Sequence, residues 1–175
     1  MGQFSPDIYV MKDAIQKVSS KVFRDFIELE NLQNSPVTAN RFANMTFEKV
    51  KEVLLSNLEK NRKDYNIILK DNEIIKNKNA EYSFIVNPIC GKSNFVHSIP
   101  YFCICINVLK NTKEKKEVVM AVIDNVIEKE TYFVEKGRGA FVNTRRIRVS
   151  ARAKLEYSLV ALKLSKNREK VMALM

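Results

Sequence analysis

Near the start of the chain, apolar residues recur at spacings of three and four, the pattern of an amphipathic helix with one buried face. This stripe consists of Ile8, Met11, Ile15, Val18, Val22 and Phe26. Ser5, Pro6 and Asp7 come just before it and supply a capping hydroxyl, a proline suited to the first turn and an early acid. A second stripe predicts another helix, which begins near Thr46. Its apolar side holds Val50, Val53, Leu54 and Leu58.

Five short runs of apolar and β-branched residues follow, and each has the composition of a strand. They span residues 65–69, 82–86, 101–108, 118–123 and 131–134. Loops are predicted at 34–36 and 76–79, where polar residues and proline gather. Helices followed by strands predict an α/β fold of the layered α+β type. No repeat or linker interrupts the pattern, so we expect a single domain over residues 1–175.

The composition is that of a globular chain, with 46% apolar and 29% charged residues. No apolar run approaches the length of a membrane span, and the first residues do not resemble a secretion signal. We therefore expect a cytoplasmic protein with no membrane association. The net charge of +10 favours anionic partners, among them small phosphates and RNA.

Basic residues gather toward the end of the sequence. They are Arg145, Arg146, Arg148, Arg152, Lys154, Lys163, Lys166, Arg168 and Lys170. Such a group is either a solvated face or a surface for nucleic acid, and the sequence leaves both interpretations open.

The three cysteines, Cys90, Cys103 and Cys105, are an odd number in a chain without a secretion signal, so no disulfide is expected. Cys103 and Cys105 would share one face of a strand. We expect them to be buried there as small apolar groups. Zinc would need further ligands, and His97 is the only histidine. A phosphatase with Cys90 as nucleophile would need an arginine where the sequence has Val96.

Gly91, Lys92 and Ser93 follow a predicted strand and are positioned to open a helix. The nucleotide-binding P-loop also contains Gly-Lys-Ser, but its first glycine would have to stand at Val86. A simpler hypothesis is that Gly91 allows a tight turn and that the following amides face a single anion. The alternative is a turn from strand to helix that binds nothing.

Residues 87–95 read Asn-Pro-Ile-Cys-Gly-Lys-Ser-Asn-Phe. This loop resembles the Asp-Pro-Ile-Asp-Gly-Thr-Thr-Asn-Phe loop of the inositol monophosphatase family, and most of all its bacterial SuhB, or extragenic suppressor, branch. The resemblance continues through Val96 and His97 and returns in Lys-Gly-Arg-Gly-Ala-Phe at 136–141. It implies the family's αβαβα fold. The family's fold is longer, so the resemblance also implies a truncated domain that lacks the C-terminal third.

The resemblance assigns the chemistry of the site position by position. The family's metal positions fall at Lys70, Asp71, Asn87, Ile89 and Cys90. Its phosphate-binding positions fall at Gly91, Lys92 and Ser93, and its catalytic pair of threonines at Lys92 and Ser93. The aspartate that helps to orient water falls near Thr46 or Phe47, and neither is acidic.

These substitutions oppose the family's chemistry, which is magnesium-dependent hydrolysis of inositol phosphates. An ammonium cannot ligate a cation, a neutral amide is a weak ligand, and a thiol is too soft for magnesium. The sequence therefore predicts a homologue with Mg²⁺ as its family cofactor, bound poorly or not at all, and with impaired or absent catalysis.

Three functions stay open at this point. The first is the family's own hydrolysis of a small phosphate. The second is a metal-free phosphate binder, in which Lys70 and Lys92 take the place of the missing cations. The third is a non-catalytic, SuhB-like partner of RNA or the transcription machinery, or a fold remnant without a site. A truncated fold would leave a surface open, so we also expect a homo-oligomer or poor solubility.

Overall fold

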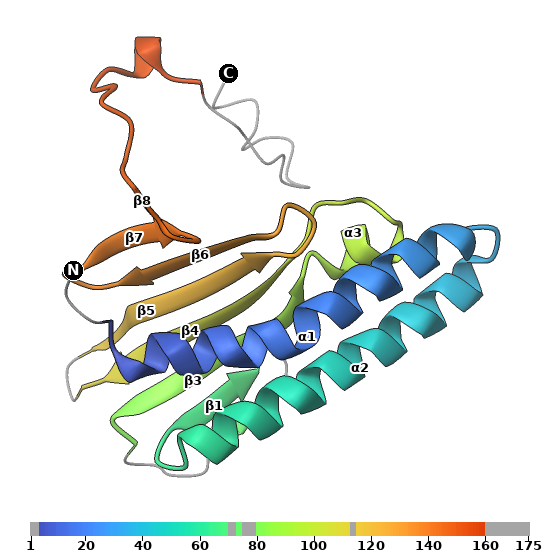
Figure 1. Cartoon of the computed structure of the whole chain (residues 1–175), viewed down its shortest axis with the longest axis horizontal. Helices are drawn as coiled ribbons and strands as arrows, with labels where there is room; N and C mark the ends of the chain where they lie inside the picture. Colours follow the sequence, from blue (N-terminus) through green and yellow to red (C-terminus); the bar gives the residue numbers. More distant parts are fainter. Residues whose placement is uncertain (1–3, 70–72, 75–79, 113–114, 160–175) are drawn as a thin grey trace, which may run out of the picture.

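The computed structural model describes residues 4–69, 73–74, 80–112 and 115–159. Two long helices lie side by side on one face of a single twisted sheet (Figure 1). The chain completes both helices before it enters the sheet, as the order of the sequence patterns predicted. The layered α/β fold class is confirmed.

Helix α1 spans Pro6–Asn31 and buries the predicted apolar stripe. Its first turn is capped by Ser5, whose side chain accepts a hydrogen bond from the amide of Asp7 at 3.3 Å. Proline occupies the first helical position, where a missing amide hydrogen costs nothing because that group would have no partner in the helix.

Helix α2 spans Pro36–Asn61, so the prediction that it begins near Thr46 is wrong by more than two turns. Ser35 caps it by accepting a hydrogen bond from the amide of Thr38 at 3.4 Å. Thr46 lies in the middle of the helix and is buried, and its hydroxyl donates to Asp25 of α1 at 2.7 Å. Because this polar contact between the helices interrupts the apolar stripe, the sequence pattern did not reveal the first half of α2.

The sheet has eight strands in the order β2-β1-β3-β4-β5-β6-β7-β8 among the described residues. Of these eight described strands, only β1 and β3 pair in parallel, and every other neighbouring pair is antiparallel. The strands are β1 Asn66–Leu69, β2 Glu73–Ile74, β3 Tyr82–Cys90, β4 Cys103–Asn111, β5 Lys116–Asn125, β6 Glu130–Glu135, β7 Gly139–Val142 and β8 Arg145–Ile147. The five runs that predicted strands correspond to β1, β3, β4, β5 and β6, so all five predictions are confirmed.

The two faces of the sheet differ in burial because successive side chains of a strand point to opposite sides. Ile104, Ile106 and Val108 of β4 face the helices and are fully buried. Cys105 and Asn107, between them, lie on the opposite face and are half-buried. We call this second side the open face, since neither α1 nor α2 covers it (Figure 1).

The remaining connections agree in part with the predicted loops. Asn34 and Ser35 lie in the turn between the helices, whereas the predicted loop at 76–79 lies outside the described residues. After β8 the chain leaves the sheet and forms a short 3₁₀ helix, Leu155–Tyr157, with no buried residue (Figure 1). None of the helices in the described ranges combines the length and apolar character that crossing a membrane requires.

Candidate functional site

The loop with the Gly-Lys-Ser sequence joins the end of β3 to a short helix, α3, which spans Lys92–Val96. Gly91 caps α3 with φ +93°, a left-handed conformation that side chains disfavour. A Cβ atom at Gly91 would also lie 2.9 Å from the carbonyl oxygen of Tyr101. Both constraints demand glycine, and the predicted tight turn that opens a helix is confirmed.

Neighbouring residues hold the backbone of this loop in place. The ring of Phe95 is fully buried, with its centroid 5.0 Å from that of Phe102 and 6.0 Å from that of Phe26 in α1. The side-chain amide of Asn94 donates to the carbonyl oxygen of Tyr101 at 2.7 Å. The loop is therefore a fixed part of the fold, anchored to the helix layer and to the residues that lead into β4.

Gln33, in the turn that follows α1, fixes the far side of the loop. Its side-chain amide lies within hydrogen-bond distance of the carbonyl oxygen of Val96 at 3.0 Å and the hydroxyl of Ser98 at 3.1 Å. The sequence patterns did not reveal this residue, because a glutamine in a turn carries no signal of a contact far along the chain.

Lys92 and Ser93 are both exposed at the start of α3. The Nζ atom of Lys92 lies 4.4 Å from the ring centroid of Phe47 in α2, a cation–π contact. Phe47 marks one of the two places where the family's water-orienting aspartate was expected, so the structure does bring that part of α2 to the loop. At this place the chain has the aromatic ring of Phe47 in contact with the ammonium of Lys92.

The predicted metal positions are only partly described. Lys70 and Asp71 lie outside the described residues. Asn87 is half-buried and pairs with Cys105, while Ile89 is buried and Cys90 is exposed. Among the described residues, no group of three or more His, Cys, Asp or Glu side chains is placed to hold a metal ion. An amide, a backbone carbonyl and a thiol do not form a donor set that fits Mg²⁺.

The three cysteines come together on the open face at the end of β3. All three thiols are free, and Cys103 and Cys105 share one face of β4 as predicted. They are half-buried, so the prediction of buried thiols is wrong. The buried positions of β4 belong to the alternate residues that face the helices. Burial, together with the neighbouring thiols of Cys90 and Cys105, raises the pKa of Cys103 to about 12.

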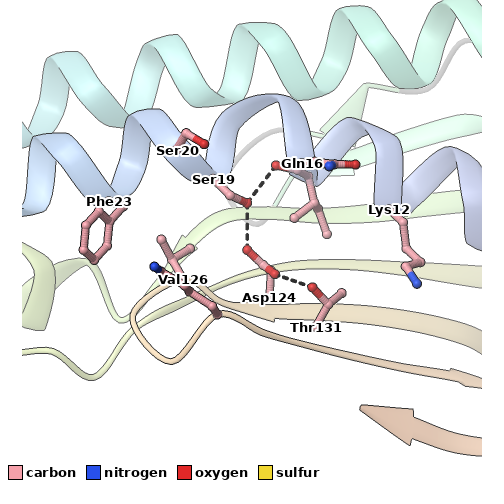
Figure 2. A pocket seen from close by; sticks show the side chains of 10 residues that line it. Lys12, Gln16, Ser19, Ser20, Phe23, Asp124, Val126 and Thr131 are labelled. Carbon is pink, nitrogen blue, oxygen red and sulfur yellow. Dashed lines mark hydrogen bonds between the residues drawn. The ribbon is translucent and has the colours of Figure 1, made fainter. Parts of the chain in front are cut away.

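A second polar group lies between α1 and the sheet, in a pocket of about 560 Å³ (Figure 2). Asp124 of β5 is buried there and accepts hydrogen bonds from Ser19 at 2.7 Å and Thr131 at 2.6 Å. The Ser19 hydroxyl also lies 2.9 Å from the carbonyl oxygen of Ile15. These bonds tie α1 to β5 and β6. The sequence patterns did not predict this contact.

Comparisons with known proteins identify the same family that the sequence of the loop resembles. A sequence model of the inositol monophosphatase family matches residues 5–173. An inositol-1-monophosphatase of Mesorhizobium japonicum is 32% identical over 83% of this chain and 53% of its own length. The Nus factor SuhB of Pseudomonas aeruginosa is 25% identical over 89% of this chain and 56% of its own length. The chain thus spans about half the length of the curated relatives it matches.

A solved structure gives the same result for the fold. The extragenic suppressor protein suhB of Bartonella henselae superposes with a TM-score of 0.72 and 31% identity. The superposition covers 87% of this chain and 57% of that protein.

Proposed function

Because the chain belongs to the inositol monophosphatase family, we propose that it keeps the family's phosphate loop as an anion site while its capacity for metal-assisted hydrolysis is impaired. One observation carries this proposal. The loop retains the backbone that Gly91 makes possible, whereas the positions of its two carboxylates hold Asn87 and Cys90. The frame of the site has therefore been kept and its metal ligands have been replaced.

The anion would be held by charge and by backbone amides. Lys92 is exposed, and a cation–π contact of an exposed ammonium is worth only about 0.5–1 kcal/mol, so its Nζ atom can turn from Phe47 to a phosphate. The first amide N–H groups of a helix have no acceptor within it, so they can donate hydrogen bonds to an anion. Ser93 adds a hydroxyl donor. A phosphate monoester of a small polyol, such as an inositol phosphate, fits these groups.

Binding of myo-inositol 1-phosphate to the purified chain tests the anion site, measured by NMR titration in the presence of a chelator. Lys92→Ala is expected to weaken binding about tenfold, since it removes a charge-assisted hydrogen bond. Lys60→Ala is the matched control, because Lys60 is exposed in α2 about 20 Å along the helix from Phe47. Equal affinity in the Lys92→Ala variant and the parent chain would refute the site.

Phosphate release from the same compound tests the impairment. We expect no release above the chelator control as Mg²⁺ is added, because the described donors do not fit that ion. Turnover that rises with magnesium would contradict the impairment and leave the anion site intact. The two parts of the proposal can thus fail separately.

A second candidate is a cytoplasmic role beside RNA or the transcription machinery, and two observations favour it. Several relatives are named Nus factor SuhB. Arg145 and Arg146 of β8 and the following Arg148 are all exposed. A shift in RNA mobility that weakens as salt increases, and that Arg146→Gln reduces, would support this role. An unchanged mobility at physiological salt would remove it.

A further inference from the structure

The last residue of β3 and the first residue of β4 are both cysteines, and they lie opposite each other on these two neighbouring strands. Cys90 and Cys103 are direct partners in the antiparallel register. The register shifts between Asn87 and Cys90, which inserts one extra residue into β3. Without this bulge, Ile89 would stand opposite Cys103, because a slip of one residue exchanges the side chains on the two faces. The bulge therefore brings the two thiols together.

The spacing of such a pair is close to that of a disulfide. Directly opposite residues of antiparallel strands have Cβ atoms about 4.5–5.5 Å apart. A disulfide needs about 3.5–4.5 Å between the Cβ atoms, so a shift of about 1 Å suffices. Cys103 and Cys105 stand two residues apart on one face of one strand, so their Cβ atoms lie about 6.6 Å apart, beyond the Cβ separation of about 3.5–4.5 Å that a disulfide needs. Cys90 with Cys103 is the pair that the fold favours.

We propose that Cys90 and Cys103 form a reversible oxidation site, which a peroxide converts into a disulfide across the two strands. Cys90 is exposed and reacts first. Its thiolate attacks one peroxide oxygen, the O–O bond breaks, and a sulfenic acid forms with release of water or an alcohol. The sulfur of Cys103 then attacks the sulfur of Cys90, the S–S bond forms as the S–O bond breaks, and the hydroxyl group leaves as water with the thiol proton of Cys103. Both thiols are oxidised by two electrons in all, and the peroxide is reduced.

The site does not depend on the proposed anion binding, although it adjoins the same loop. The bond would join the residue before Gly91 to the start of β4, and the loop between them carries Lys92 and Ser93. Oxidation would constrain both ends of that loop. The inference stands on strand register alone and would survive if the loop bound no anion.

Peptide mapping of the full chain after treatment with hydrogen peroxide, with a chelator present, tests this site. Trypsin cuts after Lys92 and so separates Cys90 from the peptide that contains Cys103 and Cys105. We expect one disulfide between these two peptides, a loss of two hydrogen atoms in the intact mass, and recovery of three free thiols after dithiothreitol. Cys105→Ala should keep the linkage, whereas Cys103→Ala should lose it.

Three outcomes would overturn the proposal. One is that the chain keeps three free thiols under conditions that oxidise a separate synthetic peptide with the sequence of residues 79–92. Another is a sulfinic or sulfonic acid on Cys90 without a linkage. The third is a linkage that Cys105→Ala removes and Cys103→Ala keeps. Circular dichroism of each variant checks its fold, and the mapping of the unmodified chain stands even if a variant does not fold.

Discussion

The face of the sheet that α1 and α2 cover differs from the open face in what its residues touch. On the covered face, Ile104 and Ile106 are fully buried, and the buried carboxylate of Asp124 has two hydroxyl donors. On the open face, Ile123 and Val134 are each 38% exposed. The covered face therefore supplies most of the burial that stabilises the fold. The open face and the loop beside it can change their chemistry without loss of the family architecture.

The largest expected effect compares two isoleucines on neighbouring strands. Ile106 is 0% exposed on the covered face, and Ile123 is 38% exposed on the open face. Ile106→Ala should lower the free energy of unfolding by about 2–5 kcal/mol, because it removes buried surface and leaves a cavity. Ile123→Ala should lower it by about 1 kcal/mol or less. Urea unfolding followed by circular dichroism measures both values.

The same pair tests whether the open face is open in solution. If Ile123→Ala destabilised the chain as much as Ile106→Ala, something would have to cover the open face. A second copy of the chain is one such cover, as the expected homo-oligomer would provide. Unfolding measured at several protein concentrations would identify a second copy as the cover, since the stability of an oligomer depends on protein concentration.

A smaller effect is expected at two turns that both require a left-handed backbone. Gly91 has φ +93° and Gly137, between β6 and β7, has φ +83°. A Cβ atom at Gly91 would meet the carbonyl oxygen of Tyr101, whereas no atom of the described residues lies within 4 Å of one at Gly137. Gly91→Ala should cost about 2–3 kcal/mol, from strain plus a backbone clash, and Gly137→Ala about 1 kcal/mol from strain alone.

Thermal or urea unfolding of both glycine variants checks this difference. Equal losses would mean that the backbone at Gly91 can move away from Tyr101 without penalty. The loop would then be less fixed than its contacts with Phe95 and Asn94 indicate, and the anion site would lose its preformed frame. Gly137→Ala serves as the control for strain, because Gly137 has the same sign of φ and its added Cβ would meet no atom of the residues that the structure describes.

Much of the fold could be predicted from local pattern, and the errors have physical causes. The stripe from Ile8 to Phe26 identified α1, because nearly every buried position there is apolar. The start of α2 was missed because Thr46 and Asp25 bury a hydrogen bond where the pattern required an apolar contact. Cys103 was assigned to the core because alternation gives the face of a strand but not which face the helices cover.

The candidate site could be located from the sequence but not built from it. The motif placed Gly91 at a turn, and the structure agrees. Two of the contacts that hold the loop come from Gln33 and Phe26, which are far away in the chain and carry no motif. The pairing of Cys90 with Cys103 depends on a bulge, and a bulge shifts register by one residue in a way that composition does not reveal.

The smallest expected effect is a pH dependence that differs between two tyrosines. Tyr65, beside the covered face, is buried and donates a hydrogen bond to Asp7 at 2.8 Å. Burial and this bond to the carboxylate raise the pKa of Tyr65 well above its usual value. A tyrosine in the unfolded chain titrates near pH 10. The stabilisation from Tyr65 is complete below that pH. It declines above that pH, because the unfolded state then binds fewer protons.

Urea midpoints measured from about pH 8 to about pH 11 test this sign. The stability advantage of the parent chain over Tyr65→Phe should be constant at the lower end and shrink toward the upper end, by about 1 kcal/mol or less. Tyr132 is the control. It pairs with Ile123 of the open face, and a hydrogen bond to Glu130 raises its pKa too, but solvent screens that interaction. Tyr132→Phe should therefore change the pH dependence less than Tyr65→Phe. The reverse order would mean that the two faces do not differ in burial as described.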